Sequence, residues 1–563
     1  MKINIDLFGG IVKKWIYIIP AIWVTIFMAS GLYSATGDII KKFPTPGSCP
    51  TGLAFDGKSF WMADRKSDSL YQINPENGAI INAVNAPGYQ IEGLACENNY
   101  IWALDIEEKS ILKFNPQTQV NEKTLPGPCD DPQGLAWDGT YLWIGDMTKD
   151  RLYQFSTEDG TTIREIPSPS GNPSGLSWDG KYLWVSDRFD DMVYMVLPEN
   201  GNVILSIPTP CKYPRGIAHD GVFLWNVDYQ SDTLYQIMLQ DTVKYIQTNE
   251  RQEKLEYIHQ FRNYGPGEIT SLDIYIAIPQ TLPYQTIIGV PIMTPSPTDY
   301  LNDKWGQKVA HYHYASLPAG GQISVSMNAS AEIYKLRYFI FPDKVGTLKD
   351  IPKEITSSYL VDDTKYWIND PIIKEAAQSA IGNETNCYWI ARKLFNYIIE
   401  KLYYERVGGW NVAPTVLKRG NGSCSEYSFV YIALCRAAGL PARYAGAVTI
   451  RGDDASTDDV FHRWVEVYLP NYGWVPIDPS GGDNSSPAGQ AAYFGHINNN
   501  YLITTLGGGS SEYLEWGYNS NEIWQSKGKC KVYTEHIGEW SPLSNSKTDS
   551  LLLEDSAKNC KPK

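Results

Sequence analysis

A repeat of 41 residues organises the N-terminal part of this chain. Within one unit, residues 134–146 read as two strands joined by an Asp-Gly turn, and residues 152–155 and 162–167 read as two more strands. Four strands per unit at this period predict the blades of an all-β propeller over residues 36–242. The repeat places glycine at Gly52, Gly93, Gly134, Gly175 and Gly216, tryptophan at Trp61, Trp102, Trp143, Trp184 and Trp225, and aspartate at Asp64, Asp105, Asp146, Asp187 and Asp228.

The N-terminal strand predicts how these units close into a ring. Residues 37–46 match residues 201–210 at an offset of 164, which is four repeats of 41, and the fifth unit loses its fourth strand after Ile237. We therefore expect the N-terminal strand to complete the last of five blades and to remove two open sheet edges. A sixth, degenerate blade after Met238 is the alternative. The units resemble NHL and lactonase-type propellers, a fold that serves many functions and assigns none by itself.

The repeated tryptophans and aspartates have structural interpretations. We expect the tryptophans to pack between blades, and each aspartate to cap the hairpin turn that follows its strand. A ring of carboxylates that holds a cation is the alternative. A calcium site needs about six or more oxygens around one point, and one aspartate per blade does not supply them.

A second feature is Gly422-Ser423-Cys424-Ser425-Glu426-Tyr427, which reads as a glycine turn that places Cys424 on the first turn of a helix. Residues 461–468 alternate like a half-buried strand that carries His462, and residues 473–479 form a short strand that ends in Asp478. A thiolate at a helix N-terminus is stabilised by the free amides there, an imidazole takes its proton, and a carboxylate fixes the imidazole tautomer. Cys424, His462 and Asp478 are therefore candidate catalytic residues.

Each of these residues has a plainer interpretation when it is taken alone. A cysteine is usually core packing, a strand histidine is usually a hydrogen-bonded side chain, and an Asp-Pro pair is usually a turn. Cys424 differs because a helical run, residues 428–438, follows it and stops at Gly439. Cys435 lies about three turns further along the same helix without such a context, so we expect a core thiol there.

Residues 422–444, 462–468 and 473–479 together resemble the transglutaminase-like superfamily, whose pattern is a Gly-x-Cys helix, a histidine strand and an aspartate strand. The resemblance implies a papain-like α+β catalytic domain, here residues 343–505. It also implies that Cys424 is the nucleophile, His462 the general base and acid, and Asp478 the orienting carboxylate. No cofactor and no metal ligand are expected. Arg463 departs from the pattern, since a small residue more often follows the histidine. It points to the opposite strand face and is expected to alter the substrate groove.

Two neighbouring segments belong to this domain. Ile390, Leu394, Ile398 and Leu402 recur at helical spacing and predict an amphipathic helix that packs a core. Residues 407–422, rich in Gly and Asn, predict a loop beside the cleft. In this loop Trp410 either covers the thiolate or packs against the helix.

Strand patterns between the two regions predict a small β-sandwich over residues 243–342, with a turn at 263–267, and residues 506–563 are left as a C-terminal extension. His311 and His313 share one face of a strand and could bind a metal. No third ligand stands at a suitable spacing, so a structural role is favoured for both.

Residues 1–35 predict export from the cytoplasm. Lys13 and Lys14 precede an apolar run of 18 residues, 15–32, with small residues near its end. This is typical of a signal peptide, and the run is also long enough to remain as a membrane anchor. We therefore expect an extracytoplasmic protein, secreted or anchored. In that setting the candidate disulfide pairs are Cys49 with Cys211 and Cys530 with Cys560.

Composition limits the partners and the class of function. A chain of 563 residues with 43% hydrophobic residues can hold three or four domains with buried cores. A net charge of -15 argues against nucleic acid and anionic lipid surfaces as partners. The sequence therefore predicts an exported thiol enzyme that acts on peptide or protein amides through a cysteine thioester, as a peptidase, deamidase or cross-linking acyltransferase. The alternative is a catalytically silent cell-surface scaffold whose propeller recognises a protein partner, although a scaffold has no need to keep all three residues.

Overall fold

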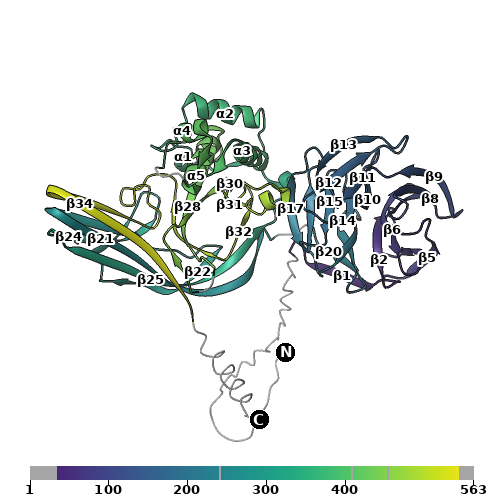
Figure 1. The fold of residues 1–563 in the computed structure, drawn as a ribbon, viewed down its shortest axis with the longest axis horizontal. Coiled ribbons are helices and arrows are strands. Elements are labelled where there is room, and N and C mark those ends of the chain that lie inside the picture. The colour runs from purple at the N-terminus through teal and green to yellow at the C-terminus, as the bar shows by residue number, and fades with distance from the viewer. Residues whose placement is uncertain (1–34, 240–242, 407–409, 453–454, 544–563) are drawn as a thin grey trace, which may run out of the picture.

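The computed structural model describes residues 35–239, 243–406, 410–452 and 455–543. The segment expected to direct export lies outside the described residues, except for Ala35. Small sheets lie at one end of the molecule, and a helical layer with a long sheet lies at the other (Figure 1). Within the described ranges, the helices are too short or too polar to cross a membrane.

Five four-stranded antiparallel sheets account for residues 39–237. The first is β2 (Pro50–Phe55), β3 (Phe60–Asp64), β4 (Ser69–Ile73) and β5 (Ile80–Asn85). The second is β6 (Ile91–Glu97), β7 (Tyr100–Asp105), β8 (Ser110–Asn115) and β9 (Val120–Pro126). The third is β10 (Pro132–Trp137), β11 (Leu142–Asp146), β12 (Arg151–Phe155) and β13 (Thr162–Pro167). The fourth is β14 (Pro173–Trp178), β15 (Leu183–Asp187), β16 (Met192–Val196) and β17 (Val203–Pro208), and the fifth is β18 (Pro214–His219), β19 (Leu224–Asp228), β20 (Thr233–Ile237) and β1 (Ile39–Pro44).

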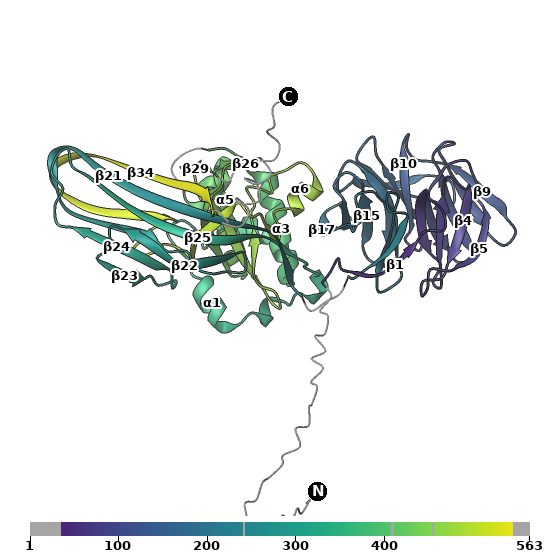
Figure 2. The ribbon, with the colours of Figure 1, turned by 90° about the horizontal axis from the view of Figure 1, so that it is seen from below.

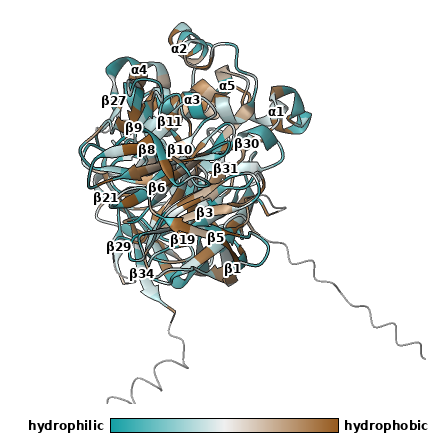
Figure 3. Cartoon of the chain, turned by 90° about the vertical axis from the view of Figure 1, so that its right-hand side faces the viewer, coloured by the Kyte–Doolittle hydropathy of each residue, from teal (hydrophilic) through white to brown (hydrophobic). Residues whose placement is uncertain are grey.

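The N-terminal strand β1 completes the fifth sheet, as its match to residues 201–210 predicts. Ile39 lies opposite Ile237 in β20, and Phe43 lies opposite Leu234. The first strands of consecutive sheets contact one another, and β18 contacts β2, so the series returns to its start. Figure 3, in which these sheets face the viewer, shows hydrophobic residues on β3 and β6. The described residues after Met238 enter a different sheet and form no sixth unit.

The repeated tryptophans and aspartates are held by hydrogen bonds within each sheet. Trp143 is 1% exposed and donates its indole N–H to Asp138 at 2.9 Å. The corresponding tryptophan of each of the other four sheets donates in the same way, and the acceptors are Asp56, Glu97, Asp179 and Asp220. The repeated aspartates cap turns as expected: Asp146 accepts from the Thr148 N–H at 2.8 Å. These hydrogen bonds explain why tryptophan and aspartate recur at the same positions of each 41-residue unit.

Eight strands of the remaining chain form one long sheet. Its order is β22-β25-β21-β24-β23, with β34 on β21, β29 on β34 and β32 on β25. The bounds are β21 (Tyr245–Ala277), β22 (Gln285–Thr294), β23 (Asp299–Asn302), β24 (Lys308–Tyr314), β25 (Gln322–Tyr338), β29 (Thr457–Asp458), β32 (His496–Ile497) and β34 (Ser520–Pro542).

Strands β21 and β34 fold back together, so that two layers of this sheet face each other (Figure 2). Ser520 lies opposite Ile276 in the ladder, yet its Oγ is 2.7 Å from Tyr257 Oη in the first half of β21. The bend lies near Gly265, in the predicted turn, where φ is +78°. A two-layered unit is therefore present, but β34, from the predicted C-terminal extension, completes it. Strand periodicity predicts strands and not their partners, which is why this pairing was not anticipated.

The helical part packs helices on a four-stranded sheet of order β31-β30-β28-β33. Helix α5 lies against β28 and β30 and is surrounded by α2, α3 and α4 (Figure 1). The predicted amphipathic helix is α3, in which Ile390, Leu394 and Ile398 are buried. The helices are α1 (Lys353–Tyr359), α2 (Pro371–Ile381), α3 (Cys387–Lys401), α4 (Ala413–Arg419), α5 (Cys424–Ala437) and α6 (Pro487–Ala491), with 3-10 turns at Pro342–Lys344 and Leu348–Asp350. Helix α4 lies within residues 407–422, so the prediction of a loop is wrong for residues 413–419. The strands are β28 (Ala442–Thr449), β30 (His462–Leu469), β31 (Gly473–Ile477) and β33 (Tyr501–Gly507), with β26 (Tyr403–Tyr404) parallel to β27 (Asn421–Gly422).

The fourth of the five sheets contacts the helical part. Helix α6 packs on β17, and the Ala488 N–H donates to the Pro169 carbonyl at 3.0 Å. Lys181 Nζ also lies 2.7 Å from Asp343 Oδ1. The two regions therefore meet through defined contacts.

The expected disulfides are not formed among the described cysteines. Cys49 and Cys211 are both free, and Cys530 is bonded to no described cysteine. The predicted partner of Cys530, Cys560, lies outside the described residues.

Candidate active site

Cys424 is the first residue of α5, directly after Ser423 at the N-cap. Its side chain is 8% exposed. The start of the helix is fixed by the buried carboxylate of Glu426, which accepts from the Ser423 N–H at 3.2 Å, from the Asn411 N–H at 3.0 Å and from Arg419 Nη2 at 3.0 Å. The Ser-x-x-Glu spacing of a capping box is the sequence signal that could have identified Glu426. These bonds hold the thiol at a defined helix N-terminus.

His462 and Asp478 reach the same place from two neighbouring strands. His462 begins β30, and Asp478 directly follows β31. His462 Nε2 lies 2.7 Å from Asp478 Oδ2, which leaves Nδ1 as the nitrogen available to Cys424. Asp478 Oδ1 accepts from the Ser480 N–H at 3.0 Å, and the His462 ring stacks on Tyr501 with a centroid separation of 5.4 Å. The imidazole is thus oriented by a carboxylate and by an aromatic ring.

The three side chains shift one another's pKa values. Burial acts to raise the pKa of Cys424, but the hydrogen bond and charge of His462 outweigh it, so the pKa lies below the ordinary value of a thiol. Burial acts to lower the pKa of His462, but Asp478 and then Cys424 raise it well above the usual range. Burial opposes the charged form of Asp478 too, yet the charge and hydrogen bond of His462 leave its pKa lowered. This arrangement favours a thiolate beside an imidazolium. The structure therefore brings the three predicted residues together.

Two tyrosines that the sequence did not single out also lie near the thiol. Burial and then the negative charge of Cys424 raise the pKa of Tyr518 to about 12. The same two causes raise the pKa of Tyr404, whose side chain is 46% exposed. Both residues come from segments without a recognisable local motif, so sequence reasoning had no signal for them.

Arg463 lies inside an aromatic cluster beside the candidate site. Its guanidinium carbon is 4.4 Å from the ring centroid of Tyr518 and 4.6 Å from that of Tyr444. The expectation that Arg463 alters the substrate groove is wrong, because the residue has no exposed surface with which to line one. Trp410 packs against the same cluster, with its ring 6.0 Å from that of Tyr518. Of its two interpretations, packing is therefore the one that these contacts favour.

Other candidates from the sequence have structural roles. Cys435 is completely buried, which raises the pKa of its thiol, as expected of a core cysteine. His311 Nε2 and His313 Nδ1 lie 2.8 and 2.9 Å from the same oxygen of Asp273. Both histidines are hydrogen-bonded side chains, and His311 Nδ1 also lies 2.8 Å from Asp299 Oδ1.

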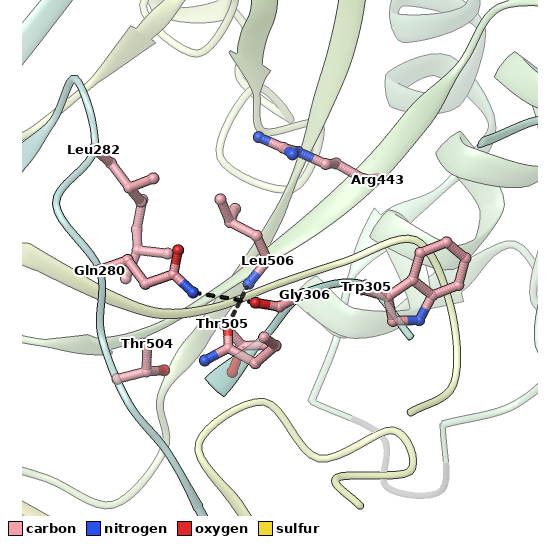
Figure 4. A pocket seen from close by; sticks show the side chains of 10 residues that line it. Gln280, Leu282, Trp305, Gly306, Arg443, Thr504, Thr505 and Leu506 are labelled. Atoms are coloured by element: carbon pink, nitrogen blue, oxygen red, sulfur yellow. Dashed lines mark hydrogen bonds between the residues drawn. The ribbon is translucent and has the colours of Figure 1, made fainter. Parts of the chain in front are cut away.

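A small cavity, drawn in Figure 4, is lined by none of the three candidate catalytic residues. Gln280 Nε2 donates to the Gly306 carbonyl across it at 3.4 Å. Its lining includes no nucleophile beside a base, so we assign it no part in the chemistry. The lining residues are Gln280, Leu282, Trp305, Gly306, Gln307, Arg443, Ile503, Thr504, Thr505 and Leu506.

Comparisons with known sequences match the helical part. The model of the Transglutaminase-like superfamily matches residues 374–479. An uncharacterized protein of Haemophilus influenzae (strain ATCC 51907 / DSM 11121 / KW20 / Rd) is 26% identical over 153 residues, which is 23% of this chain and 42% of that protein. The uncharacterized protein YebA of Bacillus subtilis (strain 168) is 35% identical over 104 residues, which is 17% of this chain and 14% of that protein. The chain therefore spans less than half the length of each of these relatives.

Two solved structures are similar to parts of the chain. A putative cysteine protease from Cytophaga hutchinsonii is 14% identical, with a TM-score of 0.38, and the match covers 53% of this chain and 100% of that one. The glutaminyl cyclase of Myxococcus xanthus is 16% identical, with a TM-score of 0.32, and the match covers 36% of this chain and 94% of that one. The family match and the motifs within it carry the assignment: residues 374–479, which include Cys424, His462 and Asp478, are a transglutaminase-like domain.

Proposed function

We propose that this protein is a thiol enzyme that acts on peptide or protein amides through Cys424. One observation carries the proposal: a thiol at a helix N-terminus, with its pKa lowered by His462, whose own Nε2 is held 2.7 Å from Asp478. A histidine oriented by a carboxylate is what a cysteine nucleophile needs for activation.

In the proposed reaction, the Cys424 thiolate attacks the amide carbonyl and His462 gives a proton to the departing amine. The C–N bond breaks as the thioester forms. Neutral His462 then accepts a proton from water or from an amine, which attacks the thioester and releases Cys424. Asp478 keeps the imidazole in the required tautomer throughout. Water as acceptor gives peptidase or deamidase activity, and an amine gives cross-linking.

We further infer that the five sheets form a closed five-bladed propeller that binds the protein substrate or a partner, in a protein exported by residues 1–35. The contact between β18 and β2 and the pairing of β1 with β20 support closure. Large exposed side chains on the connecting loops support binding: Tyr89 is 73% exposed and Phe189 is 74% exposed. Exposed aromatic rings are the residues that most often anchor protein interfaces.

The test compares wild type with Cys424→Ala on a panel of peptide amides at neutral pH. New amino termini, released ammonia and incorporated amine are measured separately, so that the three acyl acceptors are distinguished. We expect one of these products from wild type and none from Cys424→Ala. Cys530→Ala, which changes a cysteine of the long sheet, serves as the matched control and should stay active. Equal results for wild type and Cys424→Ala on every substrate would leave the binding-protein alternative.

A further inference from the structure

We propose that His259, Glu522 and His536 form a zinc site between the two layers of the long sheet. Each of the three residues offers one ligand atom, either a ring nitrogen or a carboxylate oxygen, and these three atoms lie within 4.8 Å of one another. We assign the Nε2 atoms of both histidines and one carboxylate oxygen of Glu522 as the ligands. The site is separate from Cys424, His462 and Asp478, and it goes beyond the proposed amide chemistry.

The fold-back of the sheet assembles this cluster. His259 in β21 lies directly opposite His536 in β34, and their ring centroids are 4.6 Å apart. Glu522 comes from the other half of β34, and its Oε2 is 3.7 Å from His259 Nε2 and 3.9 Å from His536 Nε2. Tetrahedral zinc with bonds of about 2.0–2.2 Å separates its ligand atoms by roughly 3.3–3.6 Å. Small side-chain rotations would therefore place all three atoms around one ion.

The two histidine nitrogens that face this point lack hydrogen-bond partners among the described residues. His259 is 0% exposed, and neither its Nε2 nor that of His536 has a partner. A buried polar nitrogen without a partner is unfavourable, and a metal ion would satisfy both nitrogens at once.

Two other polar atoms of the cluster, His259 Nδ1 and Glu522 Oε1, have partners that direct the proposed ligand atoms of these two residues inward. His259 Nδ1 lies 2.9 Å from Ser520 Oγ, which in turn lies 2.7 Å from Tyr257 Oη. Thr534 Oγ1 donates to Glu522 Oε1 at 2.8 Å, which leaves Oε2 for the ion. Metal-binding histidines usually have their second nitrogen hydrogen-bonded in this way.

The ligand set identifies the class of ion. Two imidazole nitrogens and one carboxylate oxygen suit zinc, whereas calcium and magnesium prefer sites built from oxygen alone. The side chains of His536 and Glu522 are 32% and 20% exposed, so the cluster lies near the surface of the protein. The ion would connect the two halves of β34 to β21 and so hold the layers together.

The test titrates the metal-free, tag-free full chain, with its cysteines reduced, with Co²⁺ followed by visible absorption and then by Zn²⁺ competition. We expect one bound ion per chain, displaced by Zn²⁺, and binding weakened at least about 10–100-fold in His536→Ala and in Glu522→Gln. These two partly exposed positions are used because a variant of the fully buried His259 could fail to fold. His313→Ala, which removes a histidine from the same sheet outside the cluster, should bind as wild type does.

A second readout separates binding at this cluster from binding elsewhere. Zn²⁺ should raise the thermal midpoint of wild type and of His313→Ala but not of His536→Ala. Three results overturn the proposal: no Co²⁺ binding by wild type, equal binding by wild type and both cluster variants, or intense thiolate charge-transfer bands that place the ion on a cysteine.

Discussion

One carboxylate oxygen of Asp478 is hydrogen-bonded to His462, and the other accepts hydrogen bonds from the backbone of the turn that follows Asp478. The first oxygen lies 2.7 Å from His462 Nε2, and the second accepts from the Ser480 N–H at 3.0 Å and the Gly481 N–H at 3.1 Å. The aspartate therefore fixes the imidazole and also the backbone that positions the aspartate itself. A substitution of Asp478 should therefore change the orientation of the His462 imidazole and leave the Cys424 thiol itself in place.

The first prediction concerns Asp478→Asn. An amide of the same shape removes the negative charge and can impose the wrong imidazole tautomer, so we expect kcat to fall roughly 10³–10⁴-fold with KM little changed. Steady-state kinetics on a substrate found by the amide panel measure this change. Asp459→Asn, an exposed aspartate just before β30, is the control and should be unaffected. A variant with wild-type kcat would show that the carboxylate does not orient the base.

The second prediction concerns the pH dependence of alkylation. Because the thiolate is the reactive form and the pKa of Cys424 is lowered, iodoacetamide should modify Cys424 with a midpoint below the ordinary thiol value of about 8.5. In His462→Ala the hydrogen bond and charge are lost while burial remains, so the midpoint should move above that value. Mass spectrometry of the Cys424 peptide across pH measures both midpoints. Cys387 is the internal control, because burial raises its pKa to about 12 and it should stay unmodified. Identical pH profiles for the two proteins would contradict the assignment of His462.

The third prediction concerns Glu426, whose buried carboxylate holds Ser423, Asn411 and Arg419 at the start of α5. Glu426→Ala leaves these donors unpaired, so we expect a loss of about 3–5 kcal/mol in the free energy of unfolding. Urea unfolding followed by the helical circular dichroism signal reports on this part of the chain. Glu375→Ala, at an exposed position of α2, should change stability by less than about 0.5 kcal/mol. A loss for Glu426→Ala below about 1 kcal/mol would mean that other contacts define the helix start.

The fourth prediction concerns the acidic residue that accepts a hydrogen bond from the repeated tryptophan in each of the five sheets, which is Asp138 in the third sheet. Asp138→Ala leaves the buried indole N–H of Trp143 without its partner at 2.9 Å, and we expect the third sheet to lose about 1–3 kcal/mol. Hydrogen exchange of peptides from β10 to β13 measures the local loss. Glu158→Ala, an exposed residue of the turn between β12 and β13, should leave exchange unchanged. If the Asp138→Ala and Glu158→Ala variants show the same exchange, the bond between Asp138 and Trp143 does not stabilise the third sheet.

Much of the candidate site was predictable because each of its residues stands in a local motif. Cys424 follows a glycine turn and precedes a helical run, while His462 and Asp478 lie on short alternating strands. The 41-residue repeat is likewise visible from residue spacing alone. The match of residues 37–46 to residues 201–210 correctly predicted that β1 pairs with β20. Features of this kind depend on residues that are near one another in the chain.

The parts that were missed depend on residues far apart in the chain. Tyr518 and Arg463 meet with a separation of 4.4 Å between the guanidinium carbon and the ring, but neither sequence neighbourhood indicates the other. A charged residue on an alternating strand is ordinarily expected at a surface. Arg463 is buried instead among aromatic rings, and its Nη2 donates to the Trp516 carbonyl. The pairing of β34 with β21 was missed for the same reason.

That pairing has a consequence for the order in which the protein can be made. Strand β21 leaves the ribosome long before β34, because the helical part lies between them in the chain. The five small sheets and the helices can form from contacts within their own segments, whereas one edge of β21 has no partner until Pro542 has been synthesised. A chain that stops before Ser520 would keep Cys424, His462 and Asp478, yet it would present an open strand edge to other chains. The last described strand therefore closes an edge that β21 would otherwise leave open, although it supplies none of the proposed catalytic groups.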